Sequence, residues 1–166
     1  MSIILGFIID CIFGDPYNFP HPVRLIGNLI SELEKIMRKL FPDNLYIGGV
    51  LMSLSVIFLS TAVPFLILFL CYKINIVFGI IAESIMCWYL IAPKCLKTES
   101  MKVYKAVSEN DIEKSRKAVS MIVGRDTQFL DFEEVIKATI ETVAENTSDG
   151  VTAPVFYMSF GGAVLG

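Results

Sequence analysis

The sequence predicts an all-α, polytopic membrane protein with transmembrane helices and a cytoplasmic helical layer. Of its 166 residues, 54% are hydrophobic and only 19% are charged, whereas soluble domains average about 45–50% apolar and roughly 25% charged residues. No segment shows sustained period-two alternation bounded by hairpin turns, so strands are not expected. The net charge of −3 provides no basic surface for nucleic acid, and the lipid bilayer is the expected partner instead.

Apolar segments organise the chain as a single membrane domain. Residues 1–13 predict a short apolar helix, which at about 1.5 Å per residue covers only part of a bilayer. Residues 45–92 predict a transmembrane hairpin, because Leu45–Tyr72 carries no charge and only Glu83 interrupts the apolar run that follows Lys73. The uncharged residues 151–166 predict the start of a further span.

Two polar segments, residues 14–44 and 93–150, lie between the apolar ones. Every lysine and arginine except Lys73 falls in these two segments. Because short cytoplasmic loops carry the excess of basic residues, both segments are expected on the cytoplasmic side of a multi-pass protein of the cell membrane.

Helices are expected in both polar segments. Pro22 suits the first position of an amphipathic helix in the first segment. In the second, Asn110 is expected to cap one helix and Asp131 the next, with Glu134 completing a capping box. The turn-rich residues 146–150 are expected to end that last helix.

Acidic side chains recur on one side of that last helix. Glu141, Glu145 and Asp149 are each four residues apart, and Glu134 lies seven residues before Glu141. A solvated face tolerates such repulsion at a cost of a few tenths of a kcal/mol. Alternatively, the three carboxylates collect a cation such as Mg²⁺ or hold a substrate amine.

Two short polar clusters also have a structural and a functional interpretation. His21, the single histidine, lies between two prolines and follows Asp15 closely. Such rigid turns either redirect the chain or present Asp15, His21 and Arg24 to a ligand. Arg125 and Asp126 either bond each other or bind a ligand, since arginine suits phosphate and carboxylate groups.

Two acids, Asp10 and Glu83, lie within apolar segments. Intramembrane acids are costly and commonly functional, although Asp10 is close to a helix end and Glu83 can pair across a helix bundle. The sequence contains neither a P-loop nor a Rossmann glycine motif, so those two nucleotide sites are excluded.

Two stretches carry information beyond composition. Asp10–Gly27 reads DCIFGDPYNFPHPVRLIG, and Gly124–Tyr157 reads GRDTQFLDFEEVIKATIETVAENTSDGVTAPVFY. Their motifs GDP-x-x-x-PHPVR, GRDT and E-x-x-AEN-x-x-DG strongly resemble the integral-membrane adenosylcobinamide-phosphate synthase family of cobalamin biosynthesis. The likeness covers nearly all of the chain, with the hydrophobic middle similar only in character.

The resemblance implies an ATP-dependent carbon–nitrogen (amide) ligase. Such an enzyme joins the corrinoid substrate, adenosylcobyric acid, to aminopropanol or its phosphate. ATP and Mg²⁺ would serve as substrate and counter-ion, and no tightly bound cofactor is expected.

Matching motif positions imply the site residues, which fall into three groups. Those expected to act in catalysis are Asp15, His21, Glu141 and Glu145. Those expected to bind substrate are Arg24, Arg125, Asp126 and Asn146. Those expected to bind metal are Asp149 and Asp15.

Members of the resembled family continue through more membrane spans and a further motif. We therefore expect the chain to be the amino-terminal half of a longer protein, with a carboxyl-terminal half or other cobalamin-pathway membrane proteins as partners. The alternative is a non-catalytic membrane subunit or a small transport-type protein that uses Asp10 and Glu83.

Overall fold

A computed structural model describes residues 1–14 and 22–166, and every regular element in them is helical. This confirms the all-α prediction. The elements are α1 (Ser2–Phe13), α2 (Pro22–Leu40), α3 (Leu45–Ile74), α4 (Ile76–Leu90), α5 (Pro93–Ser108), α6 (Ile112–Val119), α7 (Phe132–Thr147), the π-helical turn η1 (Ser148–Thr152), α8 (Ala153–Gly161) and the 3-10 turn η2 (Gly162–Val164).

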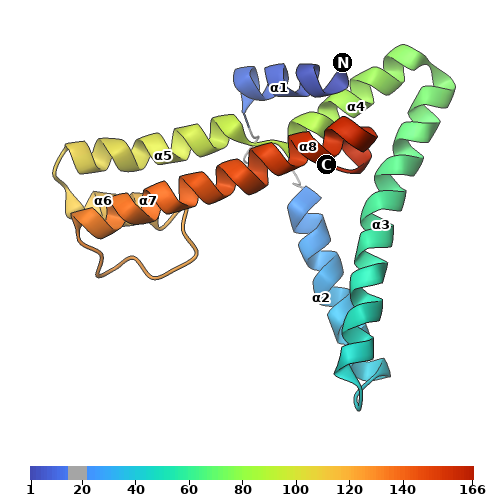
Figure 1. Ribbon diagram of the computed structural model, residues 1–166, viewed down its shortest axis with the longest axis horizontal. Coiled ribbons are helices and arrows are strands. Elements are labelled where there is room, and N and C mark those ends of the chain that lie inside the picture. The colour runs from blue at the N-terminus through green and yellow to red at the C-terminus, as the bar shows by residue number, and fades with distance from the viewer. Residues whose placement is uncertain (15–21) are drawn as a thin grey trace.

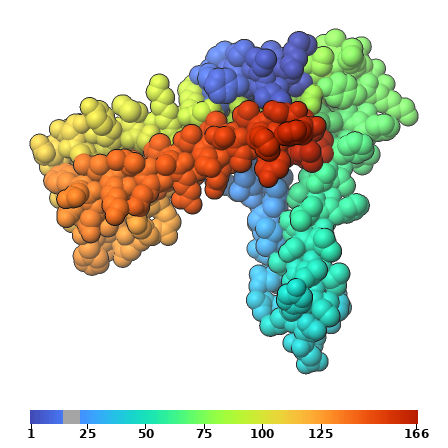
Figure 2. Space-filling model, viewed as in Figure 1, coloured from blue at the N-terminus to red at the C-terminus, as the bar shows by residue number. Residues whose placement is uncertain are grey.

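The helices form a centre with two projections (Figure 1). Helices α1, α4 and α8 make the centre. Helices α2 and α3 pack on each other and run away from it as a pair, while α5, α6 and α7 pack together as a layer on another side. The space-filling view shows the α2–α3 pair and the α5–α7 layer as separate bodies that diverge from the centre (Figure 2).

Two helical stretches, Leu45–Ile74 and Ile76–Ser108, are long and apolar enough to cross a membrane. Only Asn75 separates α3 from α4, and its side chain accepts a hydrogen bond from the backbone N–H of Val77 at 2.7 Å. The break therefore falls close to the turn expected near Lys73. The two helices meet at a corner and then diverge (Figure 1). Their orientation in a membrane stays a prediction.

Helix α1 lies beside α4 and runs in the same direction. Ser2 at its start donates a hydrogen bond to Glu83, and Gly6 in its middle lies against Cys87. A Cβ atom on Gly6 would come within 2.7 Å of the Cys87 Cβ and 2.9 Å of the Trp88 backbone nitrogen. Glycine therefore allows the two helices to approach closely.

The α5–α7 layer has its own apolar interior. Val103, Val119, Val135 and Ala138 are buried in it, each 1% exposed or less. Asp131 caps α7 through the backbone N–H of Glu134, whose side chain accepts from the Asp131 N–H, so the expected capping box is confirmed.

One local expectation was wrong and one was incomplete. Asp111, not Asn110, caps α6, because Asn110 takes a left-handed backbone angle (φ 54°) in the turn after α5. Helix α7 ends at Thr147, within the expected residues 146–150, but the chain does not turn there: η1 links α7 directly to α8. Within η1 the Thr152 hydroxyl donates to the Thr147 carbonyl oxygen at 3.1 Å, and the helix then buries Met158 at the centre. Burial of the next apolar segment thus overrides the turn preference of these residues.

Candidate functional site

The first motif is only partly described. Asp15 and His21 lie outside the described residues. Arg24 lies in the first turn of α2, where it is exposed.

The GRDT segment follows α6 and is tied to it by hydrogen bonds. The buried Thr127 donates its hydroxyl to the Arg116 carbonyl oxygen at 3.3 Å. The Asp126 carboxylate accepts from the Gln128 backbone N–H at 3.0 Å, which is an Asx turn. These two contacts shape the loop.

Arg125 pairs with Glu141 of α7, rather than with its neighbour Asp126. Its Nη2 lies 3.1 Å from the Glu141 Oε2, and the two side chains are 54% and 51% exposed. Exposed pairs of this kind contribute about 0–1 kcal/mol. An anionic ligand can therefore replace Glu141 as the partner of Arg125 at little cost.

Arg125 and Asp126 share a polar pocket of about 600 Å³. Arg116 and Lys117 of α6 also line it and bring two more cations. Sequence reasoning missed both, because basic residues on a short polar helix are equally typical of a solvated surface. Their lining partners are Glu113, Ser120, Thr127, Gln128 and Phe129.

The acidic residues of α7 and η1 are spread along an exposed surface. Glu145 and Asp149 are exposed, and Glu141 pairs with Arg125. Asn146 donates to the Thr142 carbonyl oxygen at 3.0 Å and lines a second pocket of about 260 Å³ with Glu99 of α5. Among residues 1–14 and 22–166, no three His, Cys, Asp or Glu side chains gather as a metal site. The predicted metal role of Asp149 with Asp15 stays a prediction.

The two acids of the apolar segments, Asp10 and Glu83, join helices to one another. Glu83 accepts hydrogen bonds at 2.7 Å from the hydroxyls of Ser2 and Tyr72, and so links α1, α3 and α4. Asp10 is fully buried, and its Oδ2 accepts from the Lys94 backbone N–H at 3.0 Å. These contacts give each acid a partner across the helix bundle.

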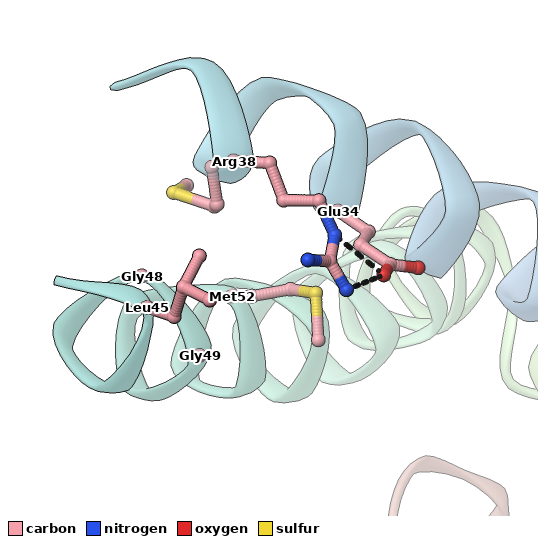
Figure 3. Close-up of a pocket in the computed structure, with 7 residues that line it drawn as sticks. Glu34, Arg38, Leu45, Gly48, Gly49 and Met52 are labelled. Atoms are coloured by element: carbon pink, nitrogen blue, oxygen red, sulfur yellow. Dashed lines mark hydrogen bonds and ion pairs between the residues drawn. The ribbon is translucent and has the colours of Figure 1, made fainter. Parts of the chain in front are cut away.

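A smaller pocket of about 160 Å³ lies between the end of α2 and the start of α3 (Figure 3). Arg38 and Glu34 form an ion pair at its edge, with 2.7 Å between Nη2 and Oε1 (Figure 3), and Gly48, Gly49 and Met52 line the pocket from α3. No described residue of the three motifs lines this pocket. The candidate site is therefore the polar pocket of the α5–α7 layer.

Comparison with known proteins places the two motif-bearing segments in one family. The sequence matches the family described as CobD/Cbib protein over residues 3–166. The chain belongs to this family. This confirms the resemblance found in the motifs.

Several curated relatives are similar to the chain along almost its whole length. The chain is 46% identical over 165 residues to a protein of Clostridium perfringens named "Cobalamin biosynthesis protein CobD", covering 99% of the chain and 52% of the relative. A Listeria monocytogenes protein of the same name is 46% identical over 161 residues, or 96% of the chain and 51% of the relative. A Salmonella typhi protein named "Cobalamin biosynthesis protein CbiB" is 39% identical over 163 residues, or 97% of the chain and 51% of the relative.

The chain thus spans about half the length of these CobD/Cbib relatives. No solved structure matches it.

Proposed function

We propose that the chain forms part of a cobalamin-biosynthesis enzyme that joins adenosylcobyric acid to aminopropanol or its phosphate by ATP-dependent amide ligation. The observation that carries this proposal is the family match over residues 3–166, together with relatives named for cobalamin biosynthesis. The GRDT loop and its polar pocket supply residues that can contact the reacting groups.

A free carboxylate is a poor acyl donor and must first be activated. A propionate oxygen attacks the γ-phosphorus of ATP, the bond to the leaving ADP oxygen breaks, and an acyl phosphate forms. The amine nitrogen then attacks the acyl carbon, the carbon–nitrogen bond forms, and inorganic phosphate leaves. A base takes the proton from the nitrogen. Both steps increase negative charge on oxygens, which positioned cations stabilise.

The polar pocket offers such cations. Arg125 presents a planar fork of donors suited to phosphoryl oxygens, and Lys117 adds a charge from α6. If Arg125 binds a phosphoryl oxygen instead of Glu141, which lies 3.1 Å away in the structure, the released carboxylate becomes available to accept a proton. We assign Glu141 as the proton acceptor on this basis.

Mg²⁺ would neutralise the triphosphate charge of ATP. This ion commonly keeps several waters and binds only one or two protein carboxylates beside the phosphates. The exposed carboxylates of Asp126 and Asp149 suit that role without a preformed cage.

A chimaera tests the proposal in a protein of family length. The chain replaces the matched half of the Clostridium perfringens relative, and the host lacks its own family member and receives cobyric acid. Mass spectrometry measures cobinamide and its phosphate. Arg125→Ala is expected to lower product formation about 10²-fold or more, because it removes a donor to growing charge.

Arg38→Ala is the matched control, because Arg38 also forms an exposed Arg–Glu pair but lies outside the polar pocket. It is expected to leave product formation unchanged. Equal activity of the two variants would overturn the assignment of the active site to the polar pocket around Arg125. An inactive chimaera, beside an active Clostridium relative, would overturn the proposed function.

A further inference from the structure

The end of α1 is held by side chains from two other helices. The carbonyl oxygen of Ile12 accepts a hydrogen bond from the Lys94 Nζ at 2.6 Å. The carbonyl oxygen of Gly14 accepts from the Trp88 indole N–H at 3.2 Å. Carbonyl groups in the last turn of a helix lack partners within it, so Lys94 and Trp88 satisfy two of them.

In return, α1 supplies the missing cap of α5. The residue at the N-cap position of α5 is Ala92, which has no side-chain acceptor. The carboxylate of Asp10 takes that role from outside the helix and accepts the Lys94 N–H at 3.0 Å. Lys94 therefore binds α1 twice, once through its backbone and once through its side chain.

The rest of α1 is also fixed. Its start is bonded to Glu83 through Ser2, and Gly6 lies against the α4 backbone too closely for a Cβ atom. The position of Gly14, the first residue of the GDP motif, is therefore fixed by contacts with α4 and α5.

We propose that Asp10 and Lys94 are positioning residues that hold Gly14, the first residue of the GDP motif, beside the start of α5. The Asp10 carboxylate acts as a hydrogen-bond acceptor and carries no proton in turnover. The contacts of Asp10 and Lys94 between α1 and α5 are present in the structure. Only their effect on catalysis rests on the proposed function.

Distance measurements between spin labels test the positioning in the 166-residue chain in lipid nanodiscs. One label is placed on the exposed Cys11 and one on Lys105→Cys, with Cys71, Cys87 and Cys95 replaced by alanine. Lys105 lies about 17 Å along α5 from Lys94, so the pair reports α1 relative to α5.

Asp10→Asn is expected to keep the distance distribution unchanged, because Asn and Asp cap helices equally well. Asp10→Ala is expected to widen it about twofold, since the lost acceptor frees the end of α1 to open locally. Both variants should show the same helical content. A wide distribution for Asp10→Asn, or a narrow one for Asp10→Ala, would overturn the proposal.

Lys94 provides a second test should Asp10→Ala fail to fold. Lys94→Met removes the donor to Ile12 and is expected to widen the distribution, whereas Lys94→Arg retains a donor and is expected to preserve it. Equal distributions for the two would overturn the role of the side chain.

Activity separates positioning from proton transfer. In the chimaera, Asp10→Asn is expected to retain product formation and Asp10→Ala to lose it. Loss in both, with an unchanged distance for Asp10→Asn, would show that the charge itself is needed. An inactive chimaera would count against the proposed function, while the distance measurements would still decide the positioning.

Discussion

The α5–α7 layer and the α2–α3 pair both project from the same centre, yet only the layer has an interior of its own. Four apolar residues of the layer are almost inaccessible, and each of its three helices contributes to them. No residue of α2 is buried, and α3 buries only Gly48 and Leu68 along its whole length. Large apolar side chains cover the outside of α3.

The difference shows how the two regions satisfy their apolar surface. The layer buries these four residues among its own helices, while Tyr104, Ile136 and Ile140 stay exposed on its surface. The α2–α3 pair needs lipid or further protein to cover it, because exposed apolar patches of this extent are unfavourable in water. This fits the proposed membrane hairpin and a chain that spans half of its relatives.

Two valine-to-alanine substitutions test this difference in packing between the layer and the α2–α3 pair. Val135→Ala in the layer is expected to lower the free energy of unfolding by about 2–3 kcal/mol, from the lost burial and the cavity left behind. Val63→Ala in α3 is expected to change it by less than about 0.5 kcal/mol, because Val63 is 54% exposed and lipid replaces its contacts. Hydrogen exchange resolved by segment in nanodiscs measures both.

A large loss of protection in Val63→Ala would show that the α2–α3 pair packs as tightly as the layer. That result would contradict the statement that only the layer has a packed interior of its own.

Two glycines sharpen the contrast between the centre and α3. Alanine at Gly6 would contact the α4 backbone, and the expected overpacking of about 2 kcal/mol outweighs a gain of about 1 kcal/mol in helix propensity. Gly6→Ala is therefore expected to destabilise the chain by about 1 kcal/mol. At Gly49 nothing lies within 4 Å of an added Cβ, so Gly49→Ala is expected to stabilise it by up to about 1 kcal/mol.

Thermal unfolding followed by circular dichroism gives the sign of each change. A neutral Gly6→Ala would mean that α1 and α4 lie farther apart than the structure has them.

Local chemistry predicted much of the fold. The uncharged run of α3, the start of α2 at Pro22 and the capping box at Asp131 follow from side-chain type and spacing, and the structure has all three. The continuous helix through residues 146–150 was missed, because burial of Met158 beyond it is a tertiary effect. The path of α1 along α4 was missed for the same reason.

The candidate site was predicted less completely. Arg125 and Asp126 were found from a motif, whereas Arg116 and Lys117 reach the same pocket only because Thr127 ties the loop to α6. Asp10 was noticed as an acid in an apolar segment. Its partner, the backbone of Lys94, lies far along the chain and leaves no sequence signal.

Acid sensitivity gives the smallest expected difference between the two regions. Asp111 caps α6 in the layer, and the N–H of Lys114, with its side chain, holds the pKa of the Asp111 carboxyl below its usual range. Because the pKa of Asp111 is lower in the folded than in the unfolded state, the charged carboxylate stabilises the helix start at pH values above the unfolded-state pKa of about 3.9. This contribution is lost as the pH falls through the folded-state pKa. Asn44 caps α3 through the N–H of Ile47 and has no proton to gain.

Carboxyl-carbon NMR is expected to place the titration midpoint of Asp111 below about 3.9. Amide protection at Ser115, corrected for intrinsic exchange, should fall as the pH drops through that midpoint, while amide protection at Gly48 should not. Asp111→Asn should abolish the pH dependence at Ser115. A midpoint at or above the usual carboxyl range would contradict the cap, because a carboxylate that accepts an N–H bond must hold its negative charge more tightly than a free one.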